Sequence, residues 1–413
     1  MRSICSKVLV FSSWADRAFF GPTASCHEIT QFADCNLVTP AVSQRTVTET
    51  KHDMFCPGMS FLSDGRIVIT GGENAETVSI YSPITNAFTR AADMKIPRGY
   101  QTSATLSDGR SLTIGGSLTG GLYGKTGEVF DSTRNIWTLL QGTDPKPLLT
   151  TDREGIVGPS KAMHWYYTDN GGSVVSASTR TNEMDQMYYT DSAATTATHL
   201  ISITDPGKPA TVEKMPNMAW ARGFANAVVL LNDQVIVSGG QARSAVFADL
   251  ESVLIPELFD PVRKTWMQLA SAAVPHNYHS VSLLLPDGTV FVGGGGMYQF
   301  VGEIFSPPYL FTSSGAAATR PVISAVSASK VIVGATITVT LAGNLQNASF
   351  VPVRMGTATH NINSDQRRVP LANIQSNGAG KYTIRLPNDS DVVIPGPWYL
   401  FALDKEWVRE QSM

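Results

Sequence analysis

Tyr278 and His279 stand side by side, immediately before an apolar run that ends at the turn Pro286-Asp287-Gly288. The run is typical of a buried strand, so the pair would present a phenol and an imidazole where a loop meets that strand. Loops in such places often carry function. Three other stretches bear thiol, phenol or imidazole groups: Lys51-His-Asp-Met-Phe-Cys56-Pro-Gly, Pro97-Arg-Gly-Tyr100-Gln and Thr357-Ala-Thr-His360.

A repeated unit must position these residues. It consists of a turn, usually Asp-Gly, then an apolar strand and a glycine pair, and the pairs end at residues 72, 116, 240 and 294. Gaps of 44 and 54 residues each match one kelch-type blade of about 50 residues, and the gap of 124 fits two or more. Each unit continues with a partner strand and an aromatic residue, such as Trp137 or Trp266. The pattern predicts an all-β protein with a kelch-type β-propeller, whose blades surround a central channel.

The repeats stop near Pro307-Pro308, and residues 313–318 read as a linker. About 90 residues with short alternating strands follow, which is enough for one immunoglobulin-like β-sandwich. We therefore expect a catalytic propeller over residues 1–312 and a C-terminal β-sandwich over residues 319–413.

Composition narrows the classes of partner. Charged residues make up 16% of the chain and the net charge is -3, which does not favour nucleic acid or an acidic membrane surface. No apolar run reaches the roughly 18 residues that span a bilayer. The N-terminal run Val8–Trp14 is too short and too strand-like for a signal peptide. Cys26 and Cys35 would bridge a loop in a secreted protein and would stay reduced in the cytosol. We expect a monomer.

On this kelch background, the four stretches in their order resemble the galactose oxidase family of copper radical oxidases, over residues 7 to 403. The resemblance implies a thioether bond between Cys56 and Tyr100. The modified tyrosine would hold a radical and also bind copper. One copper ion accepts one electron, whereas oxidation of an alcohol releases two, so a protein radical must accept the second.

The resemblance also implies the remaining metal ligands. His279 and His360 would be the imidazole ligands, and His360 would reach the metal from the second domain through the channel. Tyr278 would be the axial ligand and the base that takes the proton of the substrate hydroxyl. Imidazole and phenolate groups suit Cu(II) in a tetragonal site.

Positions that resemble substrate contacts are carried over in the same way. Arg180, Phe19 and Gln241 match pocket positions of galactose-oxidising members. Leu118 stands where those members have a tryptophan over the cross-linked tyrosine, and leucine leaves a smaller apolar wall. We therefore expect a primary aliphatic or aromatic alcohol to be preferred over galactose. His276 is interpreted as a supporting or surface residue and not as a ligand.

The predicted function is oxidation of a primary alcohol to an aldehyde, with reduction of O2 to hydrogen peroxide. One alternative is an aldehyde oxidase of the glyoxal oxidase type with the same copper site. Another is a non-catalytic kelch protein derived from such an oxidase, because each tyrosine, histidine or cysteine taken singly is also an ordinary packing or surface residue. Family resemblance indicates a secreted protein.

The chain is also shorter than a seven-bladed kelch propeller requires. Seven blades of about 50 residues need roughly 350 residues, whereas the repeats end near Pro308. Strand pairs are expected to be missing after residue 152 and after residue 180. We therefore expect a truncated form with internal gaps.

Overall fold

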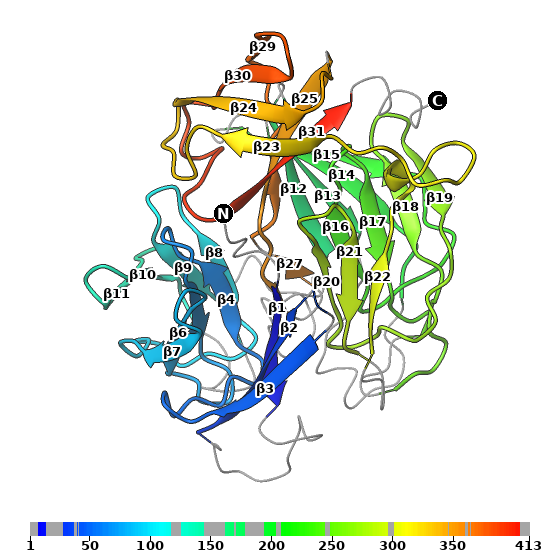
Figure 1. Ribbon diagram of the computed structural model, residues 1–413. Coiled ribbons are helices and arrows are strands. Elements are labelled where there is room, and N and C mark those ends of the chain that lie inside the picture. Colours follow the sequence, from blue (N-terminus) through cyan, green and yellow to red (C-terminus); the bar gives the residue numbers. More distant parts are fainter. Residues whose placement is uncertain are drawn as a thin grey trace.

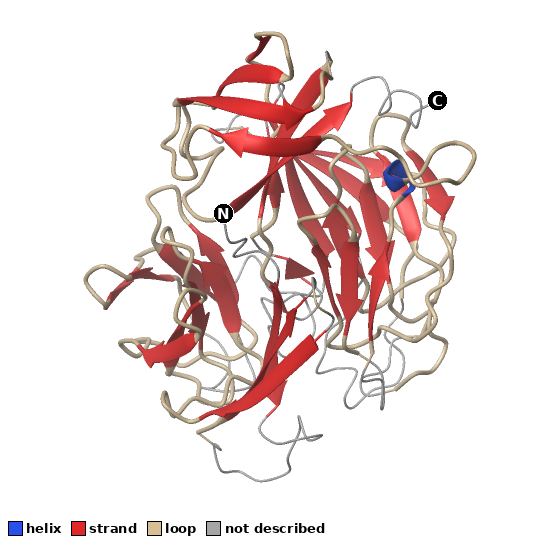
Figure 2. Cartoon of the chain, in the orientation of Figure 1, coloured by secondary structure: helices blue, strands red, loops and turns tan. Residues whose placement is uncertain are grey.

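The computed structural model describes residues 7–13, 28–36, 39, 41–116, 125–143, 162–168, 171–177, 194–203, 208–243, 248–295, 301–345, 347–359, 362–363 and 365–404. In these residues the regular structure is β, apart from the short 3-10 turn η2 (Pro308–Leu310), as Figure 2 shows. The predicted all-β fold class is confirmed. No helix in the described part of the chain is long and apolar enough to cross a membrane.

Six sheets in the described residues correspond to the repeated unit, and we call each a blade. Three blades are four-stranded. The first of these consists of β4 (Gly58–Phe61), β5 (Ile67–Thr70), β6 (Val78–Ser82) and β7 (Ala87–Arg90), and the second of β8 (Thr102–Thr105), β9 (Ser111–Ile114), β10 (Glu128–Asp131) and β11 (Ile136–Leu139). The third consists of β16 (Asn226–Val229), β17 (Val235–Ser238), β18 (Glu257–Asp260) and β19 (Thr265–Gln268). Two are three-stranded: β1 (Lys7–Ser13), β2 (Thr30–Asn36) and β3 (Ala41–Val47); β20 (Val281–Leu284), β21 (Val290–Gly293) and β22 (Gly302–Phe305). In each of them every strand pairs with the next along the chain.

The sixth blade joins the C-terminal part of the chain. It contains β12 (Ala162–Thr168), β13 (Gly171–Ala177), β14 (Thr198–Ile203) and β15 (Thr211–Met215). Strand β12 pairs in parallel with β28 (Arg367–Arg368), and the sheet continues through β25 (Ala348–Arg354) to β31 (Trp398–Asp404). This seven-stranded sheet contains strands from both sides of the expected domain boundary.

The first strands of four blades contact a small hairpin, one strand of which is labelled β27 in Figure 1. Strand β4 contacts β8, and β16 contacts both β12 and β20. The hairpin consists of β26 (Ala358–Thr359) and β27 (Ile362–Asn363). Strand β26 contacts β4 and β20, while β27 contacts β12, β16 and β20. The C-terminal part therefore sends a hairpin in among the blades.

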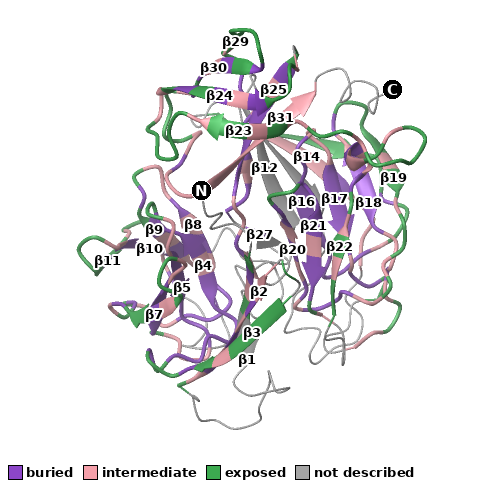
Figure 3. Cartoon of the chain, in the orientation of Figure 1, coloured by how far each residue is buried: buried purple, intermediate pink, exposed green. Residues whose placement is uncertain are grey.

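Burial decreases from the inner to the outer strands, as Figure 3 shows. All four residues of β5 and of β17 are buried, because neighbouring blades cover both faces. In the outer strands β7, β11 and β19 most residues are exposed or only partly buried. The repeat also places an aromatic pair across the third and fourth strands, and the ring centroids are 4.9 Å apart in Tyr81–Phe88, 4.9 Å in Phe130–Trp137 and 5.0 Å in Phe259–Trp266.

The C-terminal part is a β-sandwich. One sheet has the order β23 (Val322–Val326), β24 (Thr336–Ala342), β30 (Lys381–Arg385) and β29 (Ile374–Ser376). Its inner face packs on β25 and β31. Val339, Ile384 and Phe350 are fully buried between the two layers, and the ring of Tyr382 lies 5.1 Å from that of Phe350.

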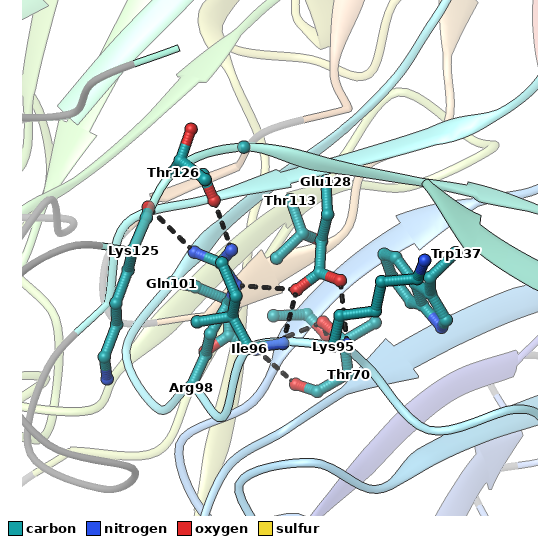
Figure 4. Close-up of polar contacts among 12 residues, drawn as sticks. Thr70, Lys95, Ile96, Arg98, Gln101, Thr113, Lys125, Thr126, Glu128 and Trp137 are labelled. Atoms are coloured by element: carbon teal, nitrogen blue, oxygen red, sulfur yellow. Dashed lines mark hydrogen bonds and ion pairs between the residues drawn. The ribbon is translucent and has the colours of Figure 1, made fainter. Parts of the chain in front are cut away.

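A buried ion pair joins the loop before β8 to strand β10 in the blade β8–β11. Arg98 and Glu128 are both fully buried, with Arg98 Nε 3.1 Å from Glu128 Oε1. The guanidinium also donates to the carbonyl oxygens of Gly115 at 2.8 Å and Lys125 at 3.0 Å. Figure 4 shows Arg98 between Glu128 and Lys125. A buried charge is tolerated only when it is paired in this way. Because Arg98 stands two residues before Tyr100, the network fixes the loop that presents Tyr100.

Two other blades repeat this arrangement. In the blade β16–β19, Arg222 Nη2 lies 2.9 Å from Glu257 Oε2, and Arg222 Nη1 donates to the Gly239 carbonyl at 2.7 Å. Burial lowers the pKa of Arg222, and Glu257 opposes that shift. In the blade β20–β22 a histidine replaces the arginine: His276 Nε2 lies 2.9 Å from Glu303 Oε2 and Nδ1 lies 3.0 Å from the Gly294 carbonyl oxygen.

Candidate metal centre

Four residues at equivalent places in the repeat have left-handed backbone conformations. The φ angles are 59° at Cys56, Tyr100 and Phe224, and 65° at His279. Each residue stands two positions before the first strand of its blade, which is β4, β8, β16 or β20. Such a φ costs a non-glycine residue about 1–3 kcal/mol, and strained residues concentrate at functional sites. The repeat thus supplies one strained residue from each of four blades.

The glycine pairs of the repeat make room for these residues. A Cβ on Gly72 would lie 2.5 Å from the carbonyl oxygen of Phe55, and a Cβ on Gly116 would lie 2.6 Å from that of Gly99. Both carbonyls belong to the residue directly before a left-handed one. In these two blades the second glycine of the pair is therefore required by the close approach of the loop that presents the site.

Two buried phenols meet at the site. The hydroxyl oxygens of Tyr100 and Tyr278 lie 3.2 Å apart, and each residue is 4% exposed. Tyr278 stacks on His279 with ring centroids 3.8 Å apart and an interplanar angle of 24°. The structure therefore brings together three of the five residues predicted to form the metal centre.

Cys56 lies against the same group. Its Sγ is 3.9 Å from His279 Nε2. The Tyr100 amide donates to the Cys56 carbonyl at 3.1 Å, and the side chains of Cys56, Tyr100 and Phe55 form one buried cluster. The residues predicted to form the thioether are therefore direct neighbours.

Two residues singled out in the sequence have supporting contacts. His276 is 2% exposed and is bonded to Glu303 and to the Gly294 carbonyl, so it holds the loop just before Tyr278. Gln241 is fully buried, and its Nε2 donates to two backbone carbonyls, Ala248 at 2.8 Å and Leu250 at 3.0 Å. In this structure the amide of Gln241 fastens a loop.

Buried polar residues beside the hairpin β26–β27 anchor it to the blades. Asp365 accepts hydrogen bonds from the Phe61 amide at 2.8 Å, from Thr105 Oγ1 at 3.1 Å and from Thr357 Oγ1 at 2.8 Å. Gln366 bonds to both the amide and the carbonyl of Val229, at 3.0 and 3.1 Å. The hairpin is therefore attached to three different blades.

The other predicted site residues, Phe19, Leu118, Arg180 and His360, lie outside the described residues, as do the segments where strand pairs were expected to be missing. Sequence reasoning did not identify Phe224, Asp365 or Gln366. A signal for Phe224 exists, because Arg222-Gly-Phe224 repeats the pattern of Arg98-Gly-Tyr100. Asp365 and Gln366 carry no local signal.

The donor set fits a copper ion. No three His, Cys, Asp or Glu side chains gather as a metal site within the described ranges. The donors that the described residues bring together are the phenol oxygens of Tyr100 and Tyr278 and the imidazole of His279. Oxygen and nitrogen ligands stand about 2.0–2.2 Å from a first-row ion. Two ligands at right angles are then about 3 Å apart, close to the 3.2 Å between the Tyr100 and Tyr278 oxygens. Phenolate and imidazole donors in a tetragonal site are typical of Cu(II).

A cavity of about 1320 Å³ reaches this site from the side, between β1, β4, β20 and the C-terminal sandwich. Cys56 and His279 line its inner end. Its walls are mainly apolar and include Val8, Met59, Leu283 and Phe291. At its edge, Ile84 and Ile332 are 80% and 78% exposed. The cavity beside Cys56 and His279 is therefore mainly apolar, and neither Tyr100 nor Tyr278 lines it.

Comparison with known proteins gives three results. Residues 320–409 match the family model of the galactose oxidase-like early set domain. The chain is 39% identical to a galactose oxidase of Gibberella zeae over 453 residues, which covers 97% of this chain and 66% of the relative. It is 27% identical to the aldehyde oxidase GLOX1 of Arabidopsis thaliana over 230 residues, which covers 48% of this chain and 37% of that protein.

The fold is also similar to a solved structure, that of a fungal alcohol oxidase with catalytic diversity among the AA5 family, in complex with copper. The TM-score is 0.84 at 33% identity, covering 98% of this chain and 93% of the other. The match to the Gibberella zeae protein extends over 453 aligned positions, whereas this chain has 413 residues. The alignment therefore includes positions of that relative that have no counterpart in this chain.

Proposed function

The chain belongs to the galactose oxidase family of copper radical oxidases, and from this premise we propose that it oxidises a primary alcohol to an aldehyde and reduces O2 to hydrogen peroxide. The observation that carries the proposal is the meeting of Tyr100, Tyr278 and His279, with hydroxyl oxygens 3.2 Å apart and the ring of Tyr278 stacked on the imidazole. The reaction balances, because the alcohol loses two electrons and two protons and O2 gains both.

Each residue has a distinct role in this proposal. Tyr100, Tyr278, His279 and His360 would hold the copper ion, which when bound supplies one of the two oxidising equivalents. The other would come from Tyr100, whose thioether bond to Cys56 makes the ring easier to oxidise.

Proton transfer falls to Tyr278. Its hydroxyl is buried beside that of Tyr100, so a substrate oxygen bound next to the two hydroxyls would be within reach of the base. A positioned base of this kind typically contributes about 10²–10⁴-fold to the rate. The surrounding burial excludes water from a site where radicals form.

We propose an apolar primary alcohol, aliphatic or aromatic, as the preferred substrate. The apolar cavity that ends at Cys56 and His279 supports this preference over a carbohydrate, as does leucine at position 118. Arg180 and Phe19 remain candidate substrate contacts. Gln241 is a weaker candidate, since backbone carbonyls already engage its amide nitrogen.

The rival functions have less support. Identity to the aldehyde oxidase is lower and covers half as much of the chain as identity to the galactose oxidase. A binding protein without catalysis would have no need for the buried phenol pair. Oxidation of a primary alcohol is therefore the better-supported function.

Copper loading of the purified chain, followed by a peroxide assay on matched primary alcohols and aldehydes, tests the proposal. We expect one copper ion per chain and faster peroxide release from alcohols than from aldehydes. Faster release from aldehydes would support the glyoxal oxidase type instead. A chain that holds no stoichiometric copper would overturn the proposal.

Three expectations about the whole protein remain proposals. We propose that it is extracellular, that it is a monomer, and that it divides into domains at residues 312 and 319. Detection in culture medium and light scattering test the first two. Limited proteolysis within residues 313–318 would support the third, and cleavage elsewhere first would contradict it.

A further inference from the structure

Phe224 occupies the same place in its blade that Tyr100 occupies in the blade β8–β11. Both follow an Arg-Gly pair and both have a φ of 59°. In both blades the arginine is buried, paired with a glutamate on the third strand and bonded to a glycine carbonyl. The same framework therefore presents a tyrosine in one blade and a phenylalanine in the other.

The side chain of Phe224 packs directly on a candidate copper ligand. Its ring lies 5.1 Å from that of Tyr278 at an interplanar angle of 64°. On the other side of the ligand pair, the ring of Phe55 lies 5.7 Å from that of His279 at 74°. Tyr278 and His279 are themselves stacked at 3.8 Å.

The four rings form a continuous row, Phe224–Tyr278–His279–Phe55, with a phenylalanine at each end. The two ends come from the loops before β16 and β4, whereas the ligand pair precedes β20. Edge-to-face contacts are favourable because the positive edge of one ring meets the negative face of the next. Rings held from two different blades cannot rotate without separating one of these contacts.

We propose that Phe224, with Phe55, forms an aromatic clamp that sets the ring planes of Tyr278 and His279 before the metal arrives. Phe224 is then a positioning residue of the copper centre. It acts through Tyr278, and its ring rather than its bulk is what matters. The role in copper binding rests on the proposed function, whereas the clamp itself is a property of the chain without metal.

The backbone at Phe224 offers a suitable set of variants. Phe224→Tyr keeps the aromatic ring. Phe224→Leu keeps an apolar side chain but removes the ring, and Phe224→Gly removes the ring while relieving the left-handed backbone. Phe259→Leu is the matched control, because Phe259 is equally buried in the same blade but packs on Trp266, 5.0 Å away.

The first measurement uses metal-free protein labelled with 3-fluorotyrosine, with the Tyr278 signals assigned by their loss in Tyr278→Phe. A clamped ring cannot flip, so fluorine on either side gives two separate signals. We expect two signals in the unmodified chain, in Phe224→Tyr and in Phe259→Leu. We expect one averaged signal in Phe224→Leu and Phe224→Gly. Two unchanged signals in both ring-deleted variants would overturn the clamp.

The second measurement is copper affinity by competition with a chelator, together with the Cu(II) electron paramagnetic resonance spectrum. We expect Phe224→Leu to weaken copper binding at least tenfold and to change the spectrum, while Phe224→Tyr restores both. Unchanged affinity and spectrum in Phe224→Leu would overturn the role at the copper centre. If the unmodified chain binds no copper, the proposed function fails, and the fluorine signals still decide whether the clamp exists.

Discussion

The hydroxyl oxygens of Tyr100 and Tyr278 lie 3.2 Å apart, although 178 residues separate them in the chain. One phenol precedes the first strand of the blade β8–β11, and the other precedes that of the blade β20–β22. Their meeting depends on the placement of blades around a common centre, which brings equivalent loops face to face. Three consequences concern the site and two concern the stability of the blades that form it.

Replacement of Tyr278, the proposed base, should slow the chemical step. For Tyr278→Phe we expect kcat to fall by about 10²–10⁴, because the proton of the substrate hydroxyl loses its acceptor. Copper should stay close to stoichiometric, because Tyr100 and His279 remain. Initial rates of peroxide release and metal analysis measure the two effects. Tyr382→Phe in the sandwich core is the control, and a wild-type kcat in Tyr278→Phe would exclude the role as base.

The neighbouring positions of Cys56 and Tyr100 predict a covalent link after aerobic copper loading. The bond forms with loss of the thiol hydrogen and one ring hydrogen, which O2 accepts as hydrogen peroxide. Copper-loaded protein should therefore migrate differently from metal-free protein on reducing denaturing gels and be lighter by two hydrogens. Cys56→Ser should abolish both differences and Cys35→Ser should retain them. Identical migration and mass before and after loading would rule out the thioether.

The anchors of the hairpin β26–β27 should matter for metal binding. Asp365→Asn removes a buried charge that accepts hydrogen bonds from the Phe61 amide and two threonine hydroxyls. The same charge forms an ion pair with Arg354, whose Nη1 lies 2.6 Å from Asp365 Oδ1. Removing one partner of a buried pair costs about 3–5 kcal/mol. We expect this loss of stability together with at least tenfold weaker copper binding.

Asp64→Asn, at an exposed carboxylate paired with Arg66, is the control for the hairpin anchor and should change neither quantity measurably. Chemical unfolding of metal-free protein and chelator competition separate the two effects. Weaker folding with unchanged copper affinity would show that the anchor stabilises the fold without placing a ligand.

The buried ion pair of the blade β16–β19 should contribute strongly to stability. Arg222→Ala leaves Glu257 charged and fully buried, so we expect a loss of about 3–5 kcal/mol in the free energy of unfolding. Lys264→Ala breaks the exposed pair with Glu213 and should cost about 0–1 kcal/mol. Urea unfolding of both variants provides the comparison, and equal losses would contradict the argument.

His52 should make stability fall in acid. It is fully buried between Ser79 Oγ at 2.9 Å and the Gly71 carbonyl at 2.8 Å. Burial lowers its pKa to about 4, the Gly71 hydrogen bond opposes this, and the charge of Arg90 adds to it. In the unfolded chain the imidazole has a pKa of about 6.5. Between the two pKa values it is therefore protonated in the unfolded chain and neutral in the folded chain. The contribution of neutral, buried His52 to the free energy of unfolding is fully present above pH 6.5 and is lost as pH falls toward 4.

His52→Gln, which keeps a polar side chain but does not titrate, should flatten the decline of unfolding free energy between pH 6.5 and pH 4. The measurement is urea unfolding at several pH values in that range. Lys51→Gln, at an exposed neighbouring position, should leave the slope as it is. An unchanged slope in His52→Gln would assign the decline to other groups.

Much of this protein was predictable from its sequence because the relevant signals are local. The spacing of turns, apolar runs and glycine pairs depends on backbone geometry and burial within one blade, so it indicated the all-β propeller directly. The order of the stretches around Cys56, Tyr100, Tyr278 and His279 indicated the family and the candidate ligands.

Tertiary structure decided how these units act on each other. The row from Phe224 to Phe55 joins loops of three blades, and the anchoring of Asp365 and Gln366 depends on where the hairpin enters the ring. Gln241 is a further example, since the side-chain amide nitrogen of this residue, which is matched to a pocket position, donates to two backbone carbonyls of a loop. Such contacts depend on the angles and distances between packed sheets. No local pattern encodes those, because they follow from the packing of all the blades together.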